Sequence, residues 1–301
     1  MRKALFIAVL VGCVVGRPMA QGRIERNVVY GMYSGLALLM DVYHSAAPNG
    51  RAVVLVLGSA FSRPLGYDAP QLKDAPAVQD WVKRITEAGY TVFVLNHRAT
   101  PRFQDPAPVE DVQRAVRFIR ANAYTFRIDP SRVGAAGGAS GGHLVSMLGT
   151  LDGAGDPADP DPVNRLSAKV QAVAALFTPV DLSIQYKHSG GVADALFVGA
   201  SIDPLTLPTD VELRRYAIAS PTSYVTPDDA PFLLIHGDKD ATVPIGQSVT
   251  MEAALRKVGV DVKFIVVPGG GHGRNFGFAA DDPRLPKWQD AVVQWFDAHL
   301  R

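Results

Sequence analysis

The sequence has little of what several protein classes require. One cysteine among 301 residues excludes an internal disulfide framework and a cysteine-rich zinc site. Thirty lysines and arginines balance 29 aspartates and glutamates, so net charge does not favour binding to nucleic acid or an anionic membrane. We find no internal repeat and no linker that would divide the chain. With 48% hydrophobic and 20% charged residues, the chain has enough apolar material for one large core.

The first twenty residues are typical of a secretory signal peptide. Met1-Arg2-Lys3 is basic, an apolar run follows, and Ala20 is a small residue suited to cleavage. The apolar run is too short to span a bilayer. Residues 10–13 are also similar to a bacterial lipobox, in which Cys13 would carry a lipid. We therefore expect a signal peptide over residues 1–20 and a secreted or periplasmic chain without a transmembrane span, with lipid anchoring as the alternative.

Short apolar runs alternate with longer amphipathic segments through the rest of the chain. The expected strands are 28–30, 36–42, 52–57, 91–95, 133–136, 170–177, 232–235 and 262–267. The expected helices are 78–88, 108–122, 142–151, 246–258 and 285–300. This alternation predicts an α/β fold, with a mostly parallel sheet of about eight strands covered by helices on both faces. We expect a single domain over 21–301, in which 182–226 is an irregular insertion that could form a lid.

A candidate nucleophile lies between one of these strands and the helix that follows it. Gly138-Ala139-Ser140-Gly141-Gly142 matches the pattern G-x-S-x-G. In a strand–turn–helix with this pattern, the serine occupies a strained turn and its Oγ is exposed at the carboxyl end of the sheet. We therefore expect Ser140 to be the nucleophile of an acyl transfer.

A serine hydroxyl becomes a good nucleophile only when a base takes its proton. Among the seven histidines, His272 follows a strand and the flexible loop Pro268-Gly269-Gly270-Gly271. A carboxylate must then orient the imidazole, and either Asp238 or Asp240 could do so because both follow the strand 232–235. The resulting chain order, serine then aspartate then histidine, is that of α/β-hydrolases.

Three segments resemble the α/β-hydrolase superfamily: residues 137–148, 236–244 and 271–273. Within it, the resemblance is to acetyl-esterase and feruloyl-esterase-like enzymes, the BD-FAE group, which is related to the hormone-sensitive-lipase-type esterases. The resemblance implies the α/β-hydrolase fold. It also selects Asp240 as the catalytic acid and leaves Asp238 to stabilise its loop.

One segment departs from the pattern of that group. Members usually carry His-Gly-Gly-x-Trp after the strand that is expected here to end at Leu57, and this chain has Leu57-Gly58-Ser59-Ala60-Phe61. An oxyanion hole uses backbone N–H groups, so we expect Ser59, Ala60 and Gly141 to provide the donors. The loss of the histidine and the second glycine changes the local support for this loop.

Together these features predict a serine carboxylesterase that hydrolyses small or carbohydrate-linked esters through an acyl-enzyme, without metal or cofactor. The expected partner is a small-molecule ester rather than nucleic acid, and the sequence carries no signal for an oligomeric state. Two alternatives remain open. One is a prolyl-oligopeptidase-like serine peptidase, and the other is a hydrolase-fold binding protein with impaired catalysis.

Overall fold

The computed structural model describes residues 22–188, 191–200 and 209–301, so the expected signal peptide and Cys13 lie outside the described residues. Its strands are β1 (Ile24–Tyr33), β2 (Leu36–Tyr43), β3 (Ala52–Val56), β4 (Thr91–Leu95), β5 (Val133–Gly138), β6 (Ala172–Leu176), β7 (Phe232–Gly237) and β8 (Val262–Val267). They form one eight-stranded sheet in the order β1-β2-β4-β3-β5-β6-β7-β8. The pairs β1–β2 and β2–β4 are antiparallel, whereas β4, β3 and β5 to β8 are parallel to one another.

The helices of the described residues are α1 (Val78–Glu87), α2 (Ala107–Ala121), α3 (Ala123–Phe126), α4 (Ser140–Thr150), α5 (Leu182–His188), α6 (Val192–Val198), α7 (Asp210–Ile218), α8 (Gly246–Lys257) and α9 (Trp288–His299). Four short 3₁₀ helices accompany them: η1 (Leu72–Asp74), η2 (Pro162–Arg165), η3 (Pro221–Tyr224) and η4 (Arg274–Gly277). None of the helices in this part of the chain is both long and apolar enough to span a bilayer.

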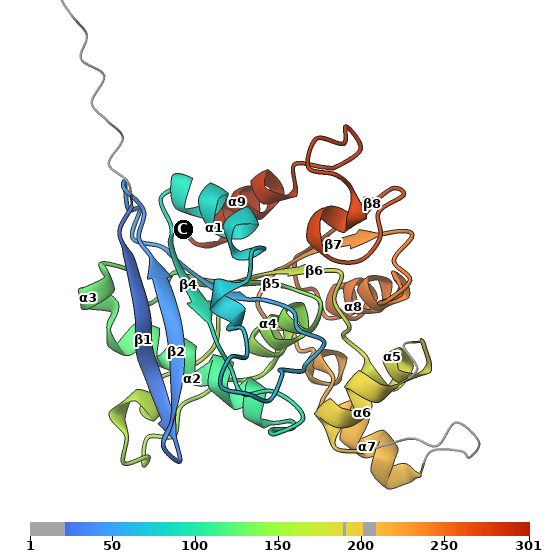
Figure 1. Cartoon of the computed structure of the whole chain (residues 1–301), viewed down its shortest axis with the longest axis horizontal. Helices are drawn as coiled ribbons and strands as arrows, with labels where there is room; N and C mark the ends of the chain where they lie inside the picture. Colours follow the sequence, from blue (N-terminus) through green and yellow to red (C-terminus); the bar gives the residue numbers. More distant parts are fainter. Residues whose placement is uncertain (1–21, 189–190, 201–208) are drawn as a thin grey trace, which may run out of the picture.

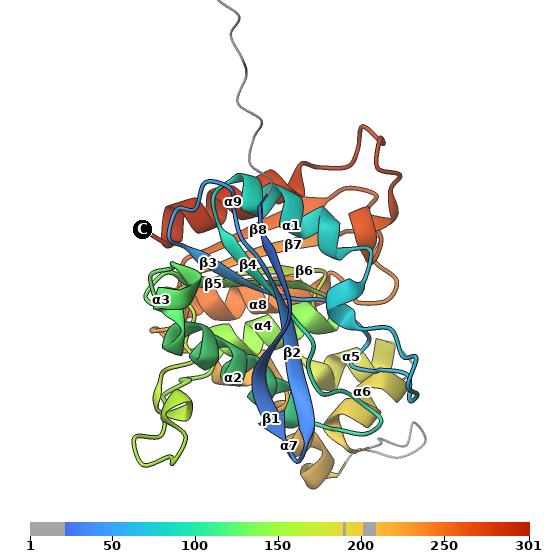
Figure 2. The same cartoon turned by 60° about the vertical axis from the view of Figure 1, so that its left-hand side comes forward.

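Helices cover both faces of the sheet, as the sequence predicts. Helices α1 and α9 pack on one face, and α2, α4 and α8 pack on the other (Figures 1 and 2). The central strands β3 to β7 are buried along their whole length, which explains why they are apolar on both sides rather than alternating. The fold class inferred from the sequence is therefore confirmed.

The segment 182–226 differs from the expected irregular insertion, because its described residues are largely helical. Gly191 and Gly199, with φ of 77° and 71°, flank α6, and Thr209 forms a capping box with Glu212 at the start of α7. These helices have only seven to nine residues, too few for a clear apolar period in the sequence. Phe197 of α6 stacks on Phe61 with ring centroids 4.1 Å apart, so the segment supports the loop after β3.

The parallel strands bring the candidate residues together. Because β3, β5, β7 and β8 run in the same direction, their carboxyl ends lie at one edge of the sheet. The loop 57–61, the turn at Ala139 and the loops that carry Asp240 and His272 all leave from this edge.

Candidate active site

The turn between β5 and α4 consists of a single residue, Ala139. Strand β5 continues to Gly138, which pairs with Leu176 of β6, and Ser140 is already the first residue of α4. Ala139 has φ 52° and ψ −128°, a combination that residues with a Cβ adopt only under strain. In a fold of this kind, the strained residue between strand and helix is the one that displays the nucleophile. The methyl group of Ala139 therefore occupies the position of a nucleophile.

Ser140 lies one residue further on and is 4% exposed. Its Oγ accepts a hydrogen bond of 2.8 Å from the N–H of Ser59, and the hydrogen bonds found among the described residues include none between Ser140 and His272. The prediction that Ser140 occupies the strained turn with an exposed Oγ is wrong. The physical reason is that β5 continues to Gly138 and α4 begins at Ser140, two residues before its expected start at Gly142, so Ala139 is the one residue left between them.

Close packing holds the beginning of α4 against the sheet. A Cβ at Gly141 would lie 2.1 Å from the carbonyl oxygen of Val56 and 2.6 Å from the carbonyl carbon of Leu57. Gly141 therefore faces the end of β3. Ser140, and not Gly141, is the residue that directly follows the turn. The sequence predicts an oxyanion donor at Gly141, one residue further from the turn.

The structure brings Asp240 and His272 together, the two residues that the sequence predicts as acid and base. Nδ1 of His272 lies 2.8 Å from Oδ2 of Asp240. The other oxygen of Asp240, Oδ1, accepts hydrogen bonds of 2.9 Å from the N–H groups of Thr242 and Val243. Burial by itself would raise the pKa of Asp240, but hydrogen bonds from His236, His272 and Val243 outweigh it and hold this pKa well below its usual range. Asp240 is thus an anion that can fix the tautomer of His272.

A second layer of polar contacts supports this pair. His236 is buried, and its Nδ1 lies 2.8 Å from Oγ of Ser248. Its Nε2 lies 2.9 Å from the Val243 carbonyl oxygen and 3.2 Å from Oδ2 of Asp240. Asp238 accepts a hydrogen bond of 2.8 Å from the N–H of Gly269, which joins the two loops. This contact agrees with the loop-stabilising role expected for Asp238.

The loop after β3 approaches the turn closely. A Cβ at Gly58 would lie 2.6 Å from the Gly138 carbonyl oxygen and 2.9 Å from Cβ of Ala139. Ala60 and Phe61 then have φ of 52° and 59°, so the backbone bends sharply after Ser59. Of the expected donors, the N–H of Ser59 is directed at Oγ of Ser140, and Ala60 lines the pocket.

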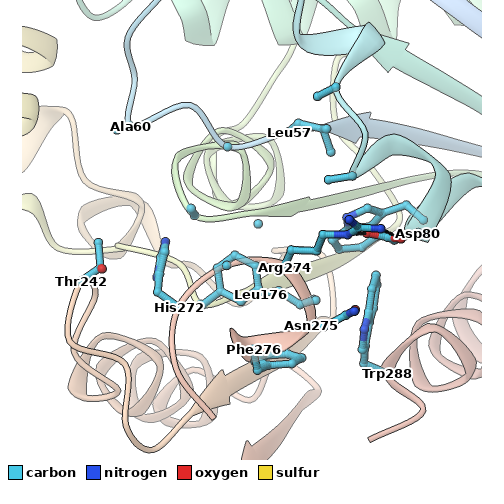
Figure 3. Close-up of a pocket in the computed structure, with 18 residues that line it drawn as sticks. Leu57, Ala60, Asp80, Leu176, Thr242, His272, Arg274, Asn275, Phe276 and Trp288 are labelled. Carbon is cyan, nitrogen blue, oxygen red and sulfur yellow. Dashed lines mark hydrogen bonds and ion pairs between the residues drawn. The ribbon is translucent and has the colours of Figure 1, made fainter. Parts of the chain in front are cut away.

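A pocket of about 400 Å³ opens beside His272 (Figure 3). Its lining includes Ala139 and, as apolar walls, Leu57, Trp81, Leu176, Phe177, Phe276 and Trp288. Figure 3 places His272 at one end and Trp288 at the other, near Arg274 and its ion-pair partner Asp80 (Nη2 to Oδ1, 2.9 Å). The pocket can therefore hold a small, largely apolar group with its reacting atom next to the imidazole. Among the residues that the structure describes, no cluster of histidine, cysteine or acidic side chains could hold a metal ion.

Comparison with known proteins places this chain in a family. The BD-FAE family model matches residues 40–255, which is most of the chain. The chain belongs to the BD-FAE family. Among curated relatives, Esterase LipQ of Mycobacterium tuberculosis is 29% identical over 82% of this chain and 56% of its own length. The acetylxylan esterase of Xylanibacter ruminicola is 27% identical over 76% of this chain and 42% of its own. The chain thus spans about half the length of these relatives.

Solved structures confirm the α/β-hydrolase fold of this BD-FAE chain. A truncated carbohydrate esterase from gut microbiota superposes with a TM-score of 0.76 at 27% identity, covering 94% of this chain and 98% of that one. An acetyl ester-xyloside bifunctional hydrolase from Caldicellulosiruptor lactoaceticus gives 0.74 at 25% identity, covering 90% and 95%. The chain therefore shares its family and fold with ester hydrolases.

Proposed function

We propose that this chain hydrolyses small carboxylic esters in the pocket beside His272, with a water molecule as the nucleophile. One observation carries the proposal: the strained turn holds Ala139, while Asp240 and His272 keep the geometry of a general base. The relatives named as esterases support ester hydrolysis as the reaction. The names acetylxylan esterase and carbohydrate esterase favour esters linked to a carbohydrate.

The reaction would begin with an ester carbonyl carbon above the methyl group of Ala139. Asp240 accepts a hydrogen bond from the Nδ1–H of His272, so Nε2 is free to take a proton from water while the water oxygen bonds to the carbonyl carbon and the ring becomes an imidazolium. The N–H groups of Ala60 and Ser140 would then hold the resulting oxyanion. The imidazolium then returns its proton to the alcohol oxygen as the ester C–O bond breaks. The products are a carboxylic acid and an alcohol, and no acyl-enzyme forms.

Such an enzyme would be slow for its family. When a nucleophile of this kind is removed, the oxyanion hole and substrate binding still give about 1000- to 10,000-fold acceleration over water. The alanine in the turn also favours a second function, an ester-binding protein without turnover, because binding needs the pocket and not the nucleophile.

Measurement of p-nitrophenyl acetate hydrolysis separates these functions. We expect the unaltered chain to show steady turnover without an initial burst, because no acyl-enzyme accumulates. His272→Ala should reduce kcat by about 100- to 10,000-fold, the usual contribution of a general base. Equal rates for His272→Ala and the unaltered chain, with the ester still bound, would favour the binding protein. A burst that disappears in Ser140→Ala would restore the serine mechanism, and cleavage of peptide amides without esters would favour the peptidase.

A further inference from the structure

The hydroxyl group of Ser140 can both accept and donate a hydrogen bond, and the described protein atoms use only its acceptor. Its oxygen accepts the hydrogen bond from the Ser59 N–H, but the hydrogen bonds found among the described residues give its proton no acceptor. Ser140 is 4% exposed and directly follows Ala139, which lines the pocket, so the hydroxyl is shielded from bulk water but lies next to the pocket wall. A buried hydroxyl with an unused proton is a donor that a ligand can complete.

The position of this hydroxyl relates it to the reacting centre. Ser140 follows the strained residue Ala139, so its own N–H is the one that the proposed mechanism assigns to the oxyanion hole. Its Oγ is bonded to the Ser59 N–H, in the loop from which we expect the other donors. The hydroxyl therefore joins the two backbone segments between which the proposed oxyanion would lie. The hydrogen bond donated by the Ser59 N–H also polarises the hydroxyl and makes the hydroxyl a stronger donor.

We propose that Ser140 is an oxyanion-stabilising residue rather than a nucleophile, and that its O–H donates a hydrogen bond to the carbonyl oxygen of a bound ester. The assignment rests on the proposed function, since it requires an ester carbonyl in this pocket. It names a catalytic role for a side chain where a fold of this kind uses backbone N–H groups. The Ser59 N–H then acts through Ser140, as the group that orients the hydroxyl.

A competing interpretation predicts a change of opposite sign. If Oγ of Ser140 merely fills the hole and occupies the Ser59 N–H, its removal should free that donor and raise kcat. If the hydroxyl donates to the oxyanion, its removal should lower kcat by about 100- to 1000-fold, the usual effect of losing one oxyanion donor. KM should change much less than kcat, because the hydrogen bond strengthens mainly in the transition state.

The experiment compares Ser140→Ala with the unaltered chain, first alone and then in an Ala139→Ser background that supplies a covalent nucleophile. Ser146→Ala is the matched control, since Ser146 is also a buried serine of α4 and its Oγ donates to the Gly142 carbonyl, away from the hole. Ser140→Thr keeps a hydroxyl and should restore part of kcat. The readouts are kcat and KM for p-nitrophenyl acetate, with circular dichroism to verify folding.

The two backgrounds keep this proposal separate from the proposed function. If the unaltered chain shows no turnover that depends on His272, the water mechanism fails, but Ala139→Ser still reports on the hole. A fall in kcat on adding Ser140→Ala to that background supports the assignment. A rise, no change, or complete inactivity of folded Ala139→Ser overturns it, because each result means that the Ser140 hydroxyl does not assist a functioning hole.

Discussion

The two halves of the site differ in how completely their polar groups are paired. The relay half, formed by residues 236–248 and 268–272, places His236, Asp240 and His272 in a continuous set of hydrogen bonds. The nucleophile half, formed by residues 57–61 and 137–142, contains a strained alanine. It also contains a buried Ser59 Oγ without a partner among the described residues.

The nucleophile half has the strained backbone of a nucleophile turn without a nucleophilic side chain in that turn. A residue held at φ 52° and ψ −128° costs about 1–3 kcal/mol, and it persists because the surrounding glycines pack too tightly to let the turn relax. An alanine gains nothing chemical from that strain, whereas a nucleophile is presented by it. In the function we propose, the relay half acts on water and the nucleophile half positions an ester.

Placing a hydroxyl at the turn should produce the largest change in kcat of all the substitutions, because it supplies the group that the nucleophile half lacks. We expect Ala139→Ser to raise kcat for p-nitrophenyl acetate by about 100-fold or more and to introduce a burst, because the strained turn then directs a covalent nucleophile toward His272. Stopped-flow absorbance measures both quantities. Ala136→Ser, in the strand β5 just before the turn, buried and outside the pocket, serves as the control. No gain in a folded Ala139→Ser protein would mean that the nucleophile half has lost more than one side chain.

Breaking the relay half should have the next largest effect. Asp240→Asn retains the shape but loses the charge that orients His272, so we expect kcat to fall by about 100-fold or more in both the unaltered chain and Ala139→Ser. Asp238→Asn, which touches the loop and not the imidazole, should leave kcat within a few-fold. Comparable losses from the two variants would show that the loop as a whole, and not the Asp240–His272 contact, matters.

Acidification should weaken the fold through a histidine packed beneath the nucleophile half. Burial lowers the pKa of His143 to about 4, and its ring lies edge-on to Phe61 with centroids 5.1 Å apart. The folded protein keeps this histidine neutral while the unfolded chain protonates it near pH 6.5. Stability is therefore fully present above pH 6.5 and falls by up to about 1.4 kcal/mol per pH unit toward pH 4.

His97 has a pKa lowered to about 4 for the same reason, burial, and adds a similar slope. Guanidinium unfolding at pH 6.5 and pH 5.0 measures the change in stability. His143→Phe should remove about half of the difference attributable to these two histidines. An unchanged pH dependence in that variant would rule out His143 as its source.

The smallest predicted effect is a change in folding stability when the backbone strain at Ala139 is relieved. Ala139→Gly should stabilise the fold by about 1 kcal/mol, because glycine adopts positive φ without the clash of a Cβ. Activity should change little, since the methyl group has no chemical role in the water mechanism. Ala136→Gly removes a buried methyl from an ordinary strand position and should destabilise instead. Thermal unfolding of the two variants provides the comparison, and a destabilised Ala139→Gly would argue against strain at the turn.

Much of the fold could be predicted because its strands are apolar and are delimited by turns. The strands at 91–95 and 262–267 match the structure at both ends, and the pairing of Asp240 with His272 follows from chain order and loop position. The turn could not be placed in the same way. Glycine is a poor strand former, so the end of β5 was expected at Ala136, whereas pairing with Leu176 extends it to Gly138.

The position of Ser140 and the helices within 182–226 differ from the sequence analysis because short sequence patterns do not fix local backbone geometry. The pattern G-x-S-x-G centres on Ser140, whereas the strained turn lies at Ala139. A five-residue pattern can be displaced in this way because the spacing of residue types does not specify the φ and ψ angles. The end of the strand before the pattern and the start of the helix after it together separate Ala139 from Ser140. The helices within 182–226 were missed because they are short, although Thr209 and Glu212 formed a recognisable capping box.

Mass spectrometry of the intact protein after treatment with a p-nitrophenyl phosphonate shows which side chain, if any, is the nucleophile. We expect the unaltered chain to gain no phosphonyl adduct in the pocket, and Ala139→Ser to gain one adduct at position 139 that requires His272. A stoichiometric adduct on Ser140 of the unaltered chain, with loss of its esterase activity, would instead make Ser140 the nucleophile.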